Sequence, residues 1–309
     1  MNSTSRLSHL PLGLHYACLA ASMALVGSYV TLSQELVAVM GVTVLAWCRF
    51  TIGALAMPHW LRKPADEPPL TPALHGWLFL ESLLGNVLFS LCMLAGVQRT
   101  SAVSAGVILS FTPMAVALLS RWWLGEHVAG RTWGGIALAV CGMGLLSLEG
   151  RMTTPEGEGT AWSDRALGNV LILAAVVCEA SYAVIGKRLT LTLSPRRITA
   201  LINLWGWALM TPLAWTALQT FEPAALHLGH WSALLFYALA ASVGTVWLWM
   251  TGLQRVPASQ AGVFTAMLPV AACTVAWALG EAPSPLQCLA LGLTLAGIAV
   301  SNWIRPAGG

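Results

Sequence analysis

The chain consists largely of apolar runs that are about as long as a lipid bilayer is thick. A helix of about 20 apolar residues crosses a hydrocarbon core of about 30 Å, so we expect an all-α membrane protein with about ten transmembrane helices. The predicted spans are residues 13–32, 38–58, 74–97, 101–123, 131–149, 167–187, 197–218, 231–252, 257–280 and 285–304.

The composition supports a chain that lies in the bilayer. Of its 309 residues 57% are hydrophobic and 9% are charged, whereas a soluble domain carries about 25% charged residues. The net charge of +3 is too small to indicate a nucleic-acid partner. Because many further spans follow it, we interpret the first run as a transmembrane helix and not as a signal peptide.

The sequence contains two copies of one unit, which are separated by roughly half the length of the chain. We therefore predict a first repeat over residues 1–150 and a second over residues 151–309, both in one transmembrane bundle, with the polar segment 150–166 as the linker. The matching motifs are Gly96-Val97-Gln98-Arg99 with Gly252-Leu253-Gln254-Arg255, Ser104-Ala105-Gly106-Val107 with Gln260-Ala261-Gly262-Val263, Pro113 with Pro269, and Leu124-Gly125-Glu126 with Leu279-Gly280-Glu281.

The basic residues predict that both termini face the cytoplasm, since loops rich in Lys and Arg stay on that side. With an odd number of helices in each half, the second repeat enters the membrane the opposite way up, and the two repeats are inverted. Inverted repeats place a site between two equivalent gates, which is the geometry of alternating access. The predicted cytoplasmic bases are Arg6, Arg62, Lys63, Arg121, Arg131, Lys187, Arg188, Arg196, Arg197, Arg255 and Arg305; Arg99, Arg151 and Arg165 fall outside.

The repeated unit resembles the EamA-type repeat of the drug/metabolite transporter superfamily. The resemblance rests on the stretches from Ala95 to Pro113 and from Thr251 to Pro269, on the Leu-Gly-Glu motif that follows each, and on Arg49-Phe50. It covers nearly the whole chain. It implies a ten-helix carrier of the bacterial inner membrane with both termini cytoplasmic, typically an exporter of amino acids or related metabolites.

Two charged residues fall near the middle of predicted spans, where a charge is costly and is expected to face the bundle interior. Arg49 is a candidate for binding a substrate carboxylate; a structural ion pair, or a deeper span that lets Arg49 reach the interface, remains the alternative. Glu179 is a candidate for binding an ammonium group or a proton, or for pairing permanently with Arg49. Further mid-depth candidates are Tyr29, Asn86, Tyr182 and Asn203, the last being the repeat counterpart of Arg49.

Two pairs of residues complete the candidate site. Trp205 and Trp247 lie deep in their spans, where they either pack against lipid or line a cavity for an aromatic, apolar or cationic substrate. Pro113 and Pro269 occupy equivalent positions in two spans, where proline kinks a helix, so they are candidate hinges or static bends.

The sequence gives little support for disulfides, metal or cofactor sites, or enzymatic activity. The seven cysteines all lie in apolar runs without a C-x-x-C pair, so we expect no disulfide, no metal site and no cofactor. No motif for an enzyme is present. Small residues at four-residue spacing in the fifth and tenth spans favour packing within the chain over dimerisation, and we expect a monomer or a weak dimer.

These observations favour a secondary transporter that exports an amino acid or a related small metabolite. A multidrug or cation carrier, or a nucleotide-sugar carrier of the same fold, is the alternative, and a channel or membrane-embedded enzyme is less favoured. Substrate, direction and coupling to protons remain open at this point.

Overall fold

The computed structural model describes residues 11–65, 67–97, 99–100, 102–153, 162–223, 226–278 and 284–302. Within these ranges the regular structure is helical and includes no strand. The chain divides into two compact units, Met1–Val87 with Ile185–Val256 and Leu88–Val184 with Pro257–Gly309. Each unit therefore contains part of each predicted repeat.

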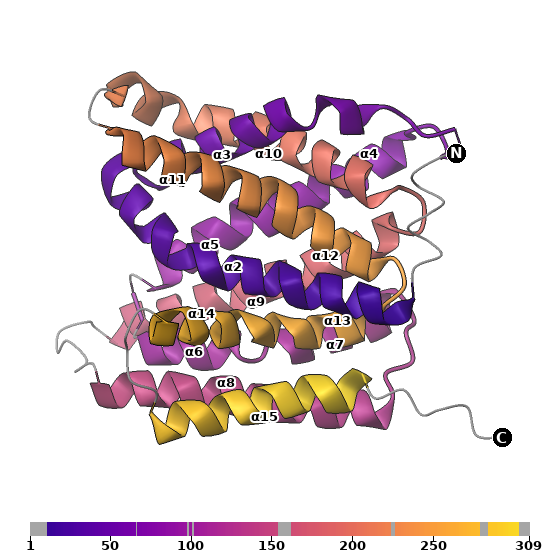
Figure 1. Ribbon diagram of the computed structural model, residues 1–309, viewed down its shortest axis with the longest axis vertical. Helices are drawn as coiled ribbons and strands as arrows, with labels where there is room; N and C mark the ends of the chain where they lie inside the picture. The colour runs from indigo at the N-terminus through magenta and orange to yellow at the C-terminus, as the bar shows by residue number, and fades with distance from the viewer. Residues whose placement is uncertain are drawn as a thin grey trace. The chain divides into compact units, whose positions relative to one another are not determined.

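In the first unit α2 lies along α12, while α3 and α4 pack against α10 and α3 also contacts α11 (Figure 1). The last turn of α9 belongs to this unit as well. Its helices are α2 (Leu12–Met40), α3 (Val42–Ala56), η1 (Pro58–Leu61), α4 (Pro72–Ser82), η2 (Leu83–Leu88), α10 (Pro195–Thr220), α11 (Leu228–Leu239), η4 (Ala240–Gly244) and α12 (Thr245–Leu253).

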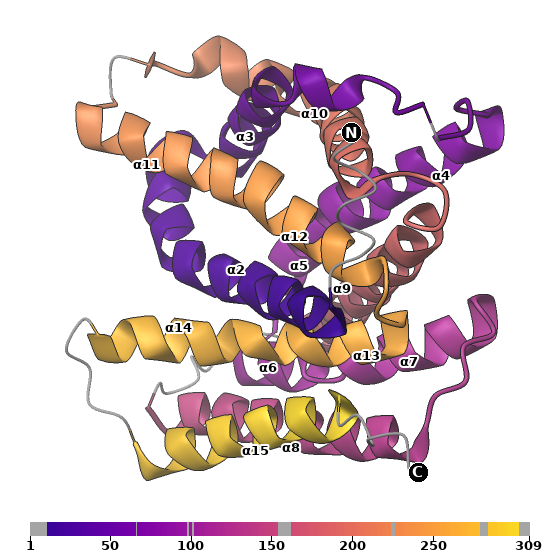
Figure 2. The ribbon, with the colours of Figure 1, turned by 45° about the vertical axis from the view of Figure 1, so that its right-hand side comes forward.

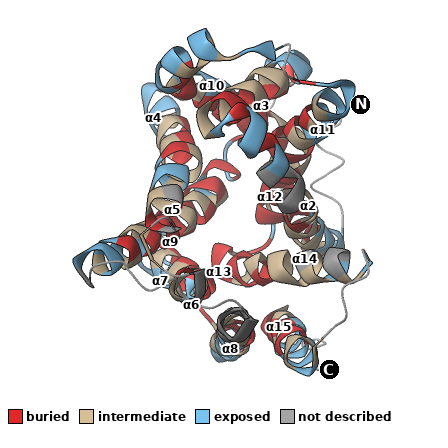
Figure 3. Ribbon diagram, turned by 90° about the vertical axis from the view of Figure 1, so that its left-hand side faces the viewer, coloured by how far each residue is buried: buried red, intermediate tan, exposed pale blue. Residues whose placement is uncertain are grey.

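In the second unit α8 lies beside α15 (Figures 2 and 3), and α7 packs against α13 and η5. Its helices are α5 (Phe89–Val97), α6 (Ala102–Leu109), α7 (Thr112–Trp123), α8 (Gly130–Thr153), most of α9 (Trp162–Leu189), α13 (Ala258–Ala261), η5 (Gly262–Ala266), α14 (Met267–Ala278) and α15 (Pro285–Asn302).

Among the described residues, seven helical runs are long and apolar enough to cross a membrane. Two further apolar helices, Val42–Ala56 and Ala258–Ala271, are shorter. The prediction of an all-helical, multi-pass membrane protein is therefore confirmed, whereas the number of ten spans stays a prediction. The seven runs are Leu12–Tyr29, Pro72–Met93, Ser104–Trp123, Ser163–Leu189, Pro195–Thr220, Leu228–Leu253 and Pro285–Asn302.

The first helix is longer than the predicted span 13–32. It continues to Met40, and a single residue, Gly41, separates it from α3. Gly41 has a φ of 72°, in the left-handed region that residues with a Cβ disfavour. The chain reverses at this glycine and not within the segment between residues 32 and 38, where the sequence suggested a break.

The repeated glycines Gly96 and Gly252 make the same contact in the two units. A Cβ on Gly96 of α5 would lie 2.7 Å from the Ile172 side chain of α9. A Cβ on Gly252 of α12 would lie 2.6 Å from the Leu19 side chain of α2. In each unit the glycine thus lets a helix of one predicted repeat approach the first helix of the other, so the two repeats are packed across each other.

Alanine at either repeated glycine is expected to destabilise the protein by about 1–3 kcal/mol, because its methyl group would overlap a helix that packs directly against it. Gly76→Ala in α4 is the matched control, since nothing lies within 4 Å of a Cβ at that position. Thermal unfolding in detergent measures the effect. Equal melting temperatures for Gly96→Ala, Gly252→Ala and Gly76→Ala would contradict this account.

Small residues bring α8 and α15 into close contact, as expected for packing within the chain. A Cβ on Gly135 of α8 would lie 2.5 Å from the Gly297 carbonyl of α15, and a Cβ on Gly297 would lie 2.6 Å from the Gly135 carbonyl. The backbones therefore meet with no space for larger side chains. The fifth and tenth predicted spans pair with each other inside the second unit.

The Leu-Gly-Glu motif of the first repeat ends one helix and caps another. Gly125 follows α7 with a φ of 66°. The Glu126 carboxylate then accepts hydrogen bonds from the Ala258 and Ser259 amides, at 2.8 and 3.1 Å, and from the Ser259 hydroxyl at 2.9 Å. These amides begin α13 and have no partner within their own helix. The second motif, Leu279-Gly280-Glu281, lies outside the described residues.

Removing this cap is expected to weaken the second unit. Glu126→Ala leaves two amides and a hydroxyl without their acceptor, which costs about 1–2 kcal/mol. The expected result is a lower melting temperature in detergent, with Glu222→Ala, an exposed carboxylate, as the control. If Glu126→Ala unfolded at the same temperature as Glu222→Ala, the carboxylate would not be a stabilising cap.

The two repeated prolines lie at helix starts rather than in the middle of continuous helices. Pro113 is the second residue of α7, which follows the end of α6 at Leu109. Pro269 is the third residue of α14, directly after the 3₁₀ turn η5. The Thr112 hydroxyl donates to the Leu109 carbonyl at 2.8 Å and so satisfies a group freed by the break. The role of both prolines as hinges stays a prediction.

Candidate functional site

Two π-helical turns occupy equivalent places in the two predicted repeats. The turn η2 carries Asn86, ten residues before Gly96, and the turn η4 carries Ser242, ten residues before Gly252. A π turn inserts a residue into a helix, frequently at functional sites, and changes which side chains face inward. Both turns lie in the first unit, next to the mid-depth candidates of α3 and α10.

The first turn joins Arg49 to α4 and α10. The Arg49 guanidinium donates to the Asn86 side-chain oxygen at 3.3 Å, and the Asn86 amide donates to the Ser82 hydroxyl at 3.3 Å. Ser82 in turn donates to the Ile202 carbonyl at 2.9 Å. A series of three hydrogen bonds therefore connects Arg49, the predicted ligand of the substrate carboxylate, to the backbone of α10.

The second turn makes the corresponding contact with Asn203. The Asn203 amide donates to the Ser242 carbonyl at 2.8 Å and to the Thr199 carbonyl at 2.8 Å. The Ser242 hydroxyl donates to the Arg49 carbonyl at 3.3 Å and links the two halves of the arrangement. We call Arg49, Ser82, Asn86, Asn203 and Ser242 the polar cluster.

The pairs Arg49–Asn86 and Asn203–Ser242 are equivalent under the repeat. Arg49 stands five residues before Ala54, and Asn203 stands five residues before its counterpart Ala208. The cluster is therefore symmetric in position but not in charge, because Arg49 is basic whereas its counterpart Asn203 is neutral. A site of this kind suits a substrate with different groups at its two ends.

The polar cluster is buried but not fully satisfied. Ser82, Asn203 and Ser242 are 0%, 2% and 1% exposed, while Arg49 and Asn86 are half-buried. The Arg49 Nε and the Asn203 Oδ1 are buried without a hydrogen-bond partner. Leaving such groups unpaired costs about 1–3 kcal/mol each, so an orphaned donor and an orphaned acceptor identify the cluster as a candidate binding site.

Arg49 has no acidic partner in the described part of its unit. The ion pair found there joins Arg197 to Glu67 at 2.8 Å, near the start of α10. The Arg49 guanidinium lies over the Phe50 ring, 4.3 Å from its centroid. Its positive charge is therefore held by an aromatic face and an amide, not neutralised by a carboxylate.

Two glycines allow the helices to meet at this cluster. A Cβ on Gly53 of α3 would lie 2.8 Å from the Ser242 Cβ of η4. A Cβ on Gly206 of α10 would lie 2.7 Å from the Phe50 ring that supports Arg49. Close backbone approach thus brings the hydrogen-bonding groups within reach of one another.

Tyr29 is the next candidate that the structure brings to this region. Its ring packs edge-on against Tyr237 with centroids 5.4 Å apart. Its hydroxyl lies within the electrostatic range of Arg49. Tyr29 therefore adjoins the polar cluster from α2.

The two deep tryptophans belong to separate aromatic pairs. Trp205 of α10 packs edge-on against Phe79 of α4, with centroids 5.3 Å apart. Trp247 of α12 packs against Trp60 of η1 at 6.2 Å. Each tryptophan has a packing partner, and their role in substrate binding stays a prediction.

Glu179 and Tyr182 lie in the part of α9 that belongs to the second unit, one helical turn apart. Both side chains are half-buried. The predicted fixed pairing of Glu179 with Arg49 remains untested, and so does their convergence on one substrate.

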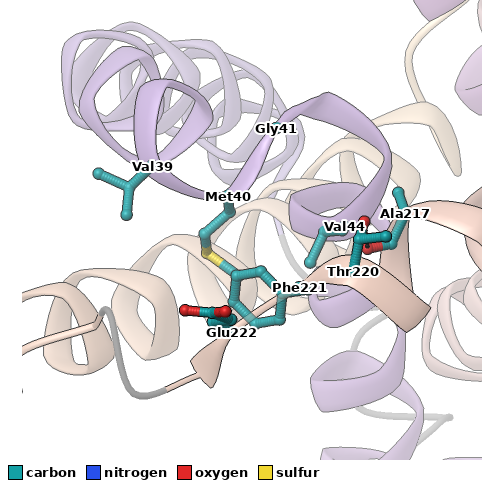
Figure 4. Close-up of a pocket in the computed structure, with 8 residues that line it drawn as sticks. All are labelled: Val39, Met40, Gly41, Val44, Ala217, Thr220, Phe221 and Glu222. Carbon is teal, nitrogen blue, oxygen red and sulfur yellow. Dashed lines mark hydrogen bonds between the residues drawn. The ribbon is translucent and has the colours of Figure 1, made fainter.

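A surface pocket lies at the ends of α2, α3 and α10 (Figure 4). Its cavity of about 420 Å³ has both polar and apolar walls and includes one carboxylate, and no residue of the polar cluster lines it. The orphaned hydrogen-bonding groups therefore belong to a different place in the unit. The lining residues are Val39, Met40, Gly41, Val44, Ala217, Thr220, Phe221 and Glu222.

Sequence reasoning missed Ser82 and Ser242. Ser242 has a recognisable signal, because it is the repeat counterpart of Asn86, which was already a candidate. A position-by-position comparison of the two repeats therefore finds it. Ser82 carries no comparable signal, since its contact with Ile202 depends on how α4 packs against α10.

Removing the Asn203 amide is expected to weaken the contact between α10 and η4. Asn203→Leu leaves the Ser242 carbonyl without this donor, at a cost of about 1–3 kcal/mol in the free energy of unfolding. Leu204→Ala is the control, because Leu204 is exposed on the same helix. Denaturation in detergent measures both; unchanged stability of Asn203→Leu would show that the hydrogen bonds contribute nothing.

Comparison with known proteins identifies the family. The model of the EamA-like transporter family matches residues 13–148 and again residues 166–303. Two matches of this extent cover most of the chain and place it among membrane transporters with a duplicated unit. The chain belongs to the EamA-like transporter family, as the repeated motifs predicted.

Two relatives agree with this assignment. The chain is 34% identical over 269 residues to the uncharacterized transporter YetK of Bacillus subtilis, covering 87% of this chain and 80% of YetK. It is 29% identical over 300 residues to the threonine/homoserine exporter RhtA of Escherichia coli K12, covering 94% and 92% of the two chains.

The fold has a counterpart among solved structures. One crystal structure superposes with a TM-score of 0.71, covering 92% of this chain and 95% of the other, at 19% sequence identity. At that identity the likeness shows a shared fold and says nothing about substrate.

Proposed function

We propose that this transporter exports an amino acid or a closely related metabolite across the bacterial inner membrane by alternating access, with both termini in the cytoplasm. The similarity to RhtA, which is named as a threonine/homoserine exporter, supports this substrate class. The predicted inverted repeats supply the two gates, and the excess of basic residues in the predicted cytoplasmic loops supports the orientation.

The observation that carries the proposal is the state of Arg49. Its guanidinium is half-buried, has no carboxylate partner in the described part of its unit, and keeps Nε without an acceptor. A guanidinium binds a carboxylate through paired hydrogen bonds. In our proposal the carboxylate of the substrate provides the missing acceptor.

The rest of the polar cluster suits the other end of an amino acid. The buried Asn203 oxygen has no donor, and an ammonium group offers three. Because Arg49 Nε and the Asn203 oxygen are both buried in this conformation, the substrate reaches them only when the carrier opens.

Proteoliposome counterflow tests the function. We expect saturable exchange of radiolabelled threonine or homoserine, and no comparable exchange of cationic dyes or aromatic metabolites. Flux that does not saturate would indicate a channel. Saturable exchange of cationic dyes without amino-acid exchange would favour the multidrug alternative, for which the aromatic pairs of Trp205 and Trp247 provide stacking surfaces.

Arg49→Ala is expected to lower threonine exchange by about tenfold or more, the effect of losing a hydrogen bond to a charged group. The exchange of threonine amide, which lacks the carboxylate, is expected to change little. Arg62→Ala, at an exposed base beyond η1, is the control. An Arg49→Ala variant that exchanges threonine as fast as Arg62→Ala would exclude Arg49 as the carboxylate ligand.

A further inference from the structure

Glu81 is the most completely buried carboxyl group in the described part of the first unit. It lies in the last turn of α4, directly before Ser82 of the polar cluster, and is 0% exposed. Neither of its oxygens has a hydrogen-bond partner. A buried charge is normally paired or bound to a cation. The burial of this carboxyl without either therefore requires another explanation.

The Glu81 carboxyl lies beside Gly186 of α9, near two apolar side chains of α12. A Cβ on Gly186 of α9 would lie 2.9 Å from the Glu81 Oε1, so a glycine provides the space that the carboxyl occupies. The same Cβ would lie 3.1 Å from the Met250 methyl and 3.3 Å from a Leu253 methyl, both of α12. These neighbours offer no hydrogen-bond donor to an ionised carboxylate.

The nearest basic residue along α9 has other partners. Lys187 follows Gly186, and its ammonium group donates to the carbonyls of Leu253, Gln254 and Val256 at 2.6, 3.4 and 2.9 Å. It therefore caps the end of α12 and does not neutralise Glu81.

The basic side chains of α9 and α10 also have other contacts. Arg255 lies beyond the end of α12, which itself contains no charged residue. On α9 and α10, Arg188 lies 4.5 Å from the Trp77 ring, Arg196 lies 6.0 Å from the Trp60 ring, and Arg197 pairs with Glu67 at 2.8 Å.

We propose that Glu81 binds and releases one proton in each transport cycle. In the present conformation the carboxyl holds its proton, since the enclosure stabilises a neutral acid and not an isolated charge. When the contact of α4 with Gly186 and α12 opens, water reaches the group, the O–H bond breaks, and the proton leaves to water with the carboxylate remaining. Uptake from the opposite side reverses this step.

The position of Glu81 connects the proton to the substrate. Its neighbour Ser82 donates to the Ile202 carbonyl and accepts from Asn86, which contacts Arg49. A movement of α4 that exposes Glu81 therefore also disturbs the hydrogen bonds that orient Arg49. The coupling rests on the proposed amino-acid transport, whereas the protonation of Glu81 does not.

Infrared spectroscopy of the protein in liposomes tests the protonation without any substrate. At neutral pH the wild type is expected to show the carbonyl band of a protonated carboxylic acid. The intensity of this band should fall by the contribution of one carboxylic acid per protein in Glu81→Gln. It should be unchanged in Glu222→Gln, which changes an exposed acid. An equal band in the wild type and in Glu81→Gln would overturn the proposal. Glu81→Asp, which keeps an acid in place, is expected to retain the band if Glu81→Gln fails to fold.

A transport measurement tests the coupling of the proton to the substrate separately from proton binding by Glu81. With threonine as the probe, Glu81→Gln is expected to lose at least tenfold of the accumulation driven by a pH gradient, while Glu222→Gln, which changes an exposed acid, keeps it. Accumulation at the wild-type level in Glu81→Gln would refute the coupling. Absence of threonine counterflow in the wild type would instead reject the proposed function, and the infrared result would still decide whether Glu81 holds a proton.

Discussion

The close approach of helices at the repeated glycines is the contact on which the remaining arrangement depends. Gly252 lets α12 lie directly on α2, and Gly96 lets α5 lie directly on α9. Each contact joins one predicted repeat to the other, so neither repeat forms a compact unit by itself. In an apolar environment, tight packing of small residues replaces the hydrophobic effect as the source of helix association.

Within this frame the first unit keeps a set of polar groups away from lipid. Two π turns direct Asn86 and Ser242 toward Arg49 and Asn203, and two glycines bring the backbones together there. The cost of burying polar groups explains why most of them are hydrogen-bonded. Among the buried groups without a partner are atoms of Arg49, Asn203 and Glu81, to which we assign substrate and proton.

The sequence predicted the main features of the fold and part of the site. Apolar runs of bilayer length predicted the helical membrane protein, and the duplicated motifs predicted the family. Arg49, Asn86 and Asn203 were found because charge and amide groups inside apolar runs are costly and stand out. The end of α2 was misplaced, because helix continues through Glu35 and a single glycine decides where the chain turns. The prolines were placed in mid-helix because periodicity alone does not reveal the break before Pro113.

By itself, the sequence determined that the chain is a helical, multi-pass membrane protein and which residues occur twice, because length, apolarity and repetition are properties of the chain alone. Tertiary structure decided what the repeated residues do: Gly252 meets Leu19, Glu126 caps α13, and Ser242 reaches Arg49. It also decided that Glu81, an acid within the third predicted span, is buried without a hydrogen-bond partner. These outcomes depend on contacts between residues far apart in sequence, and such contacts exist only after the helices have packed.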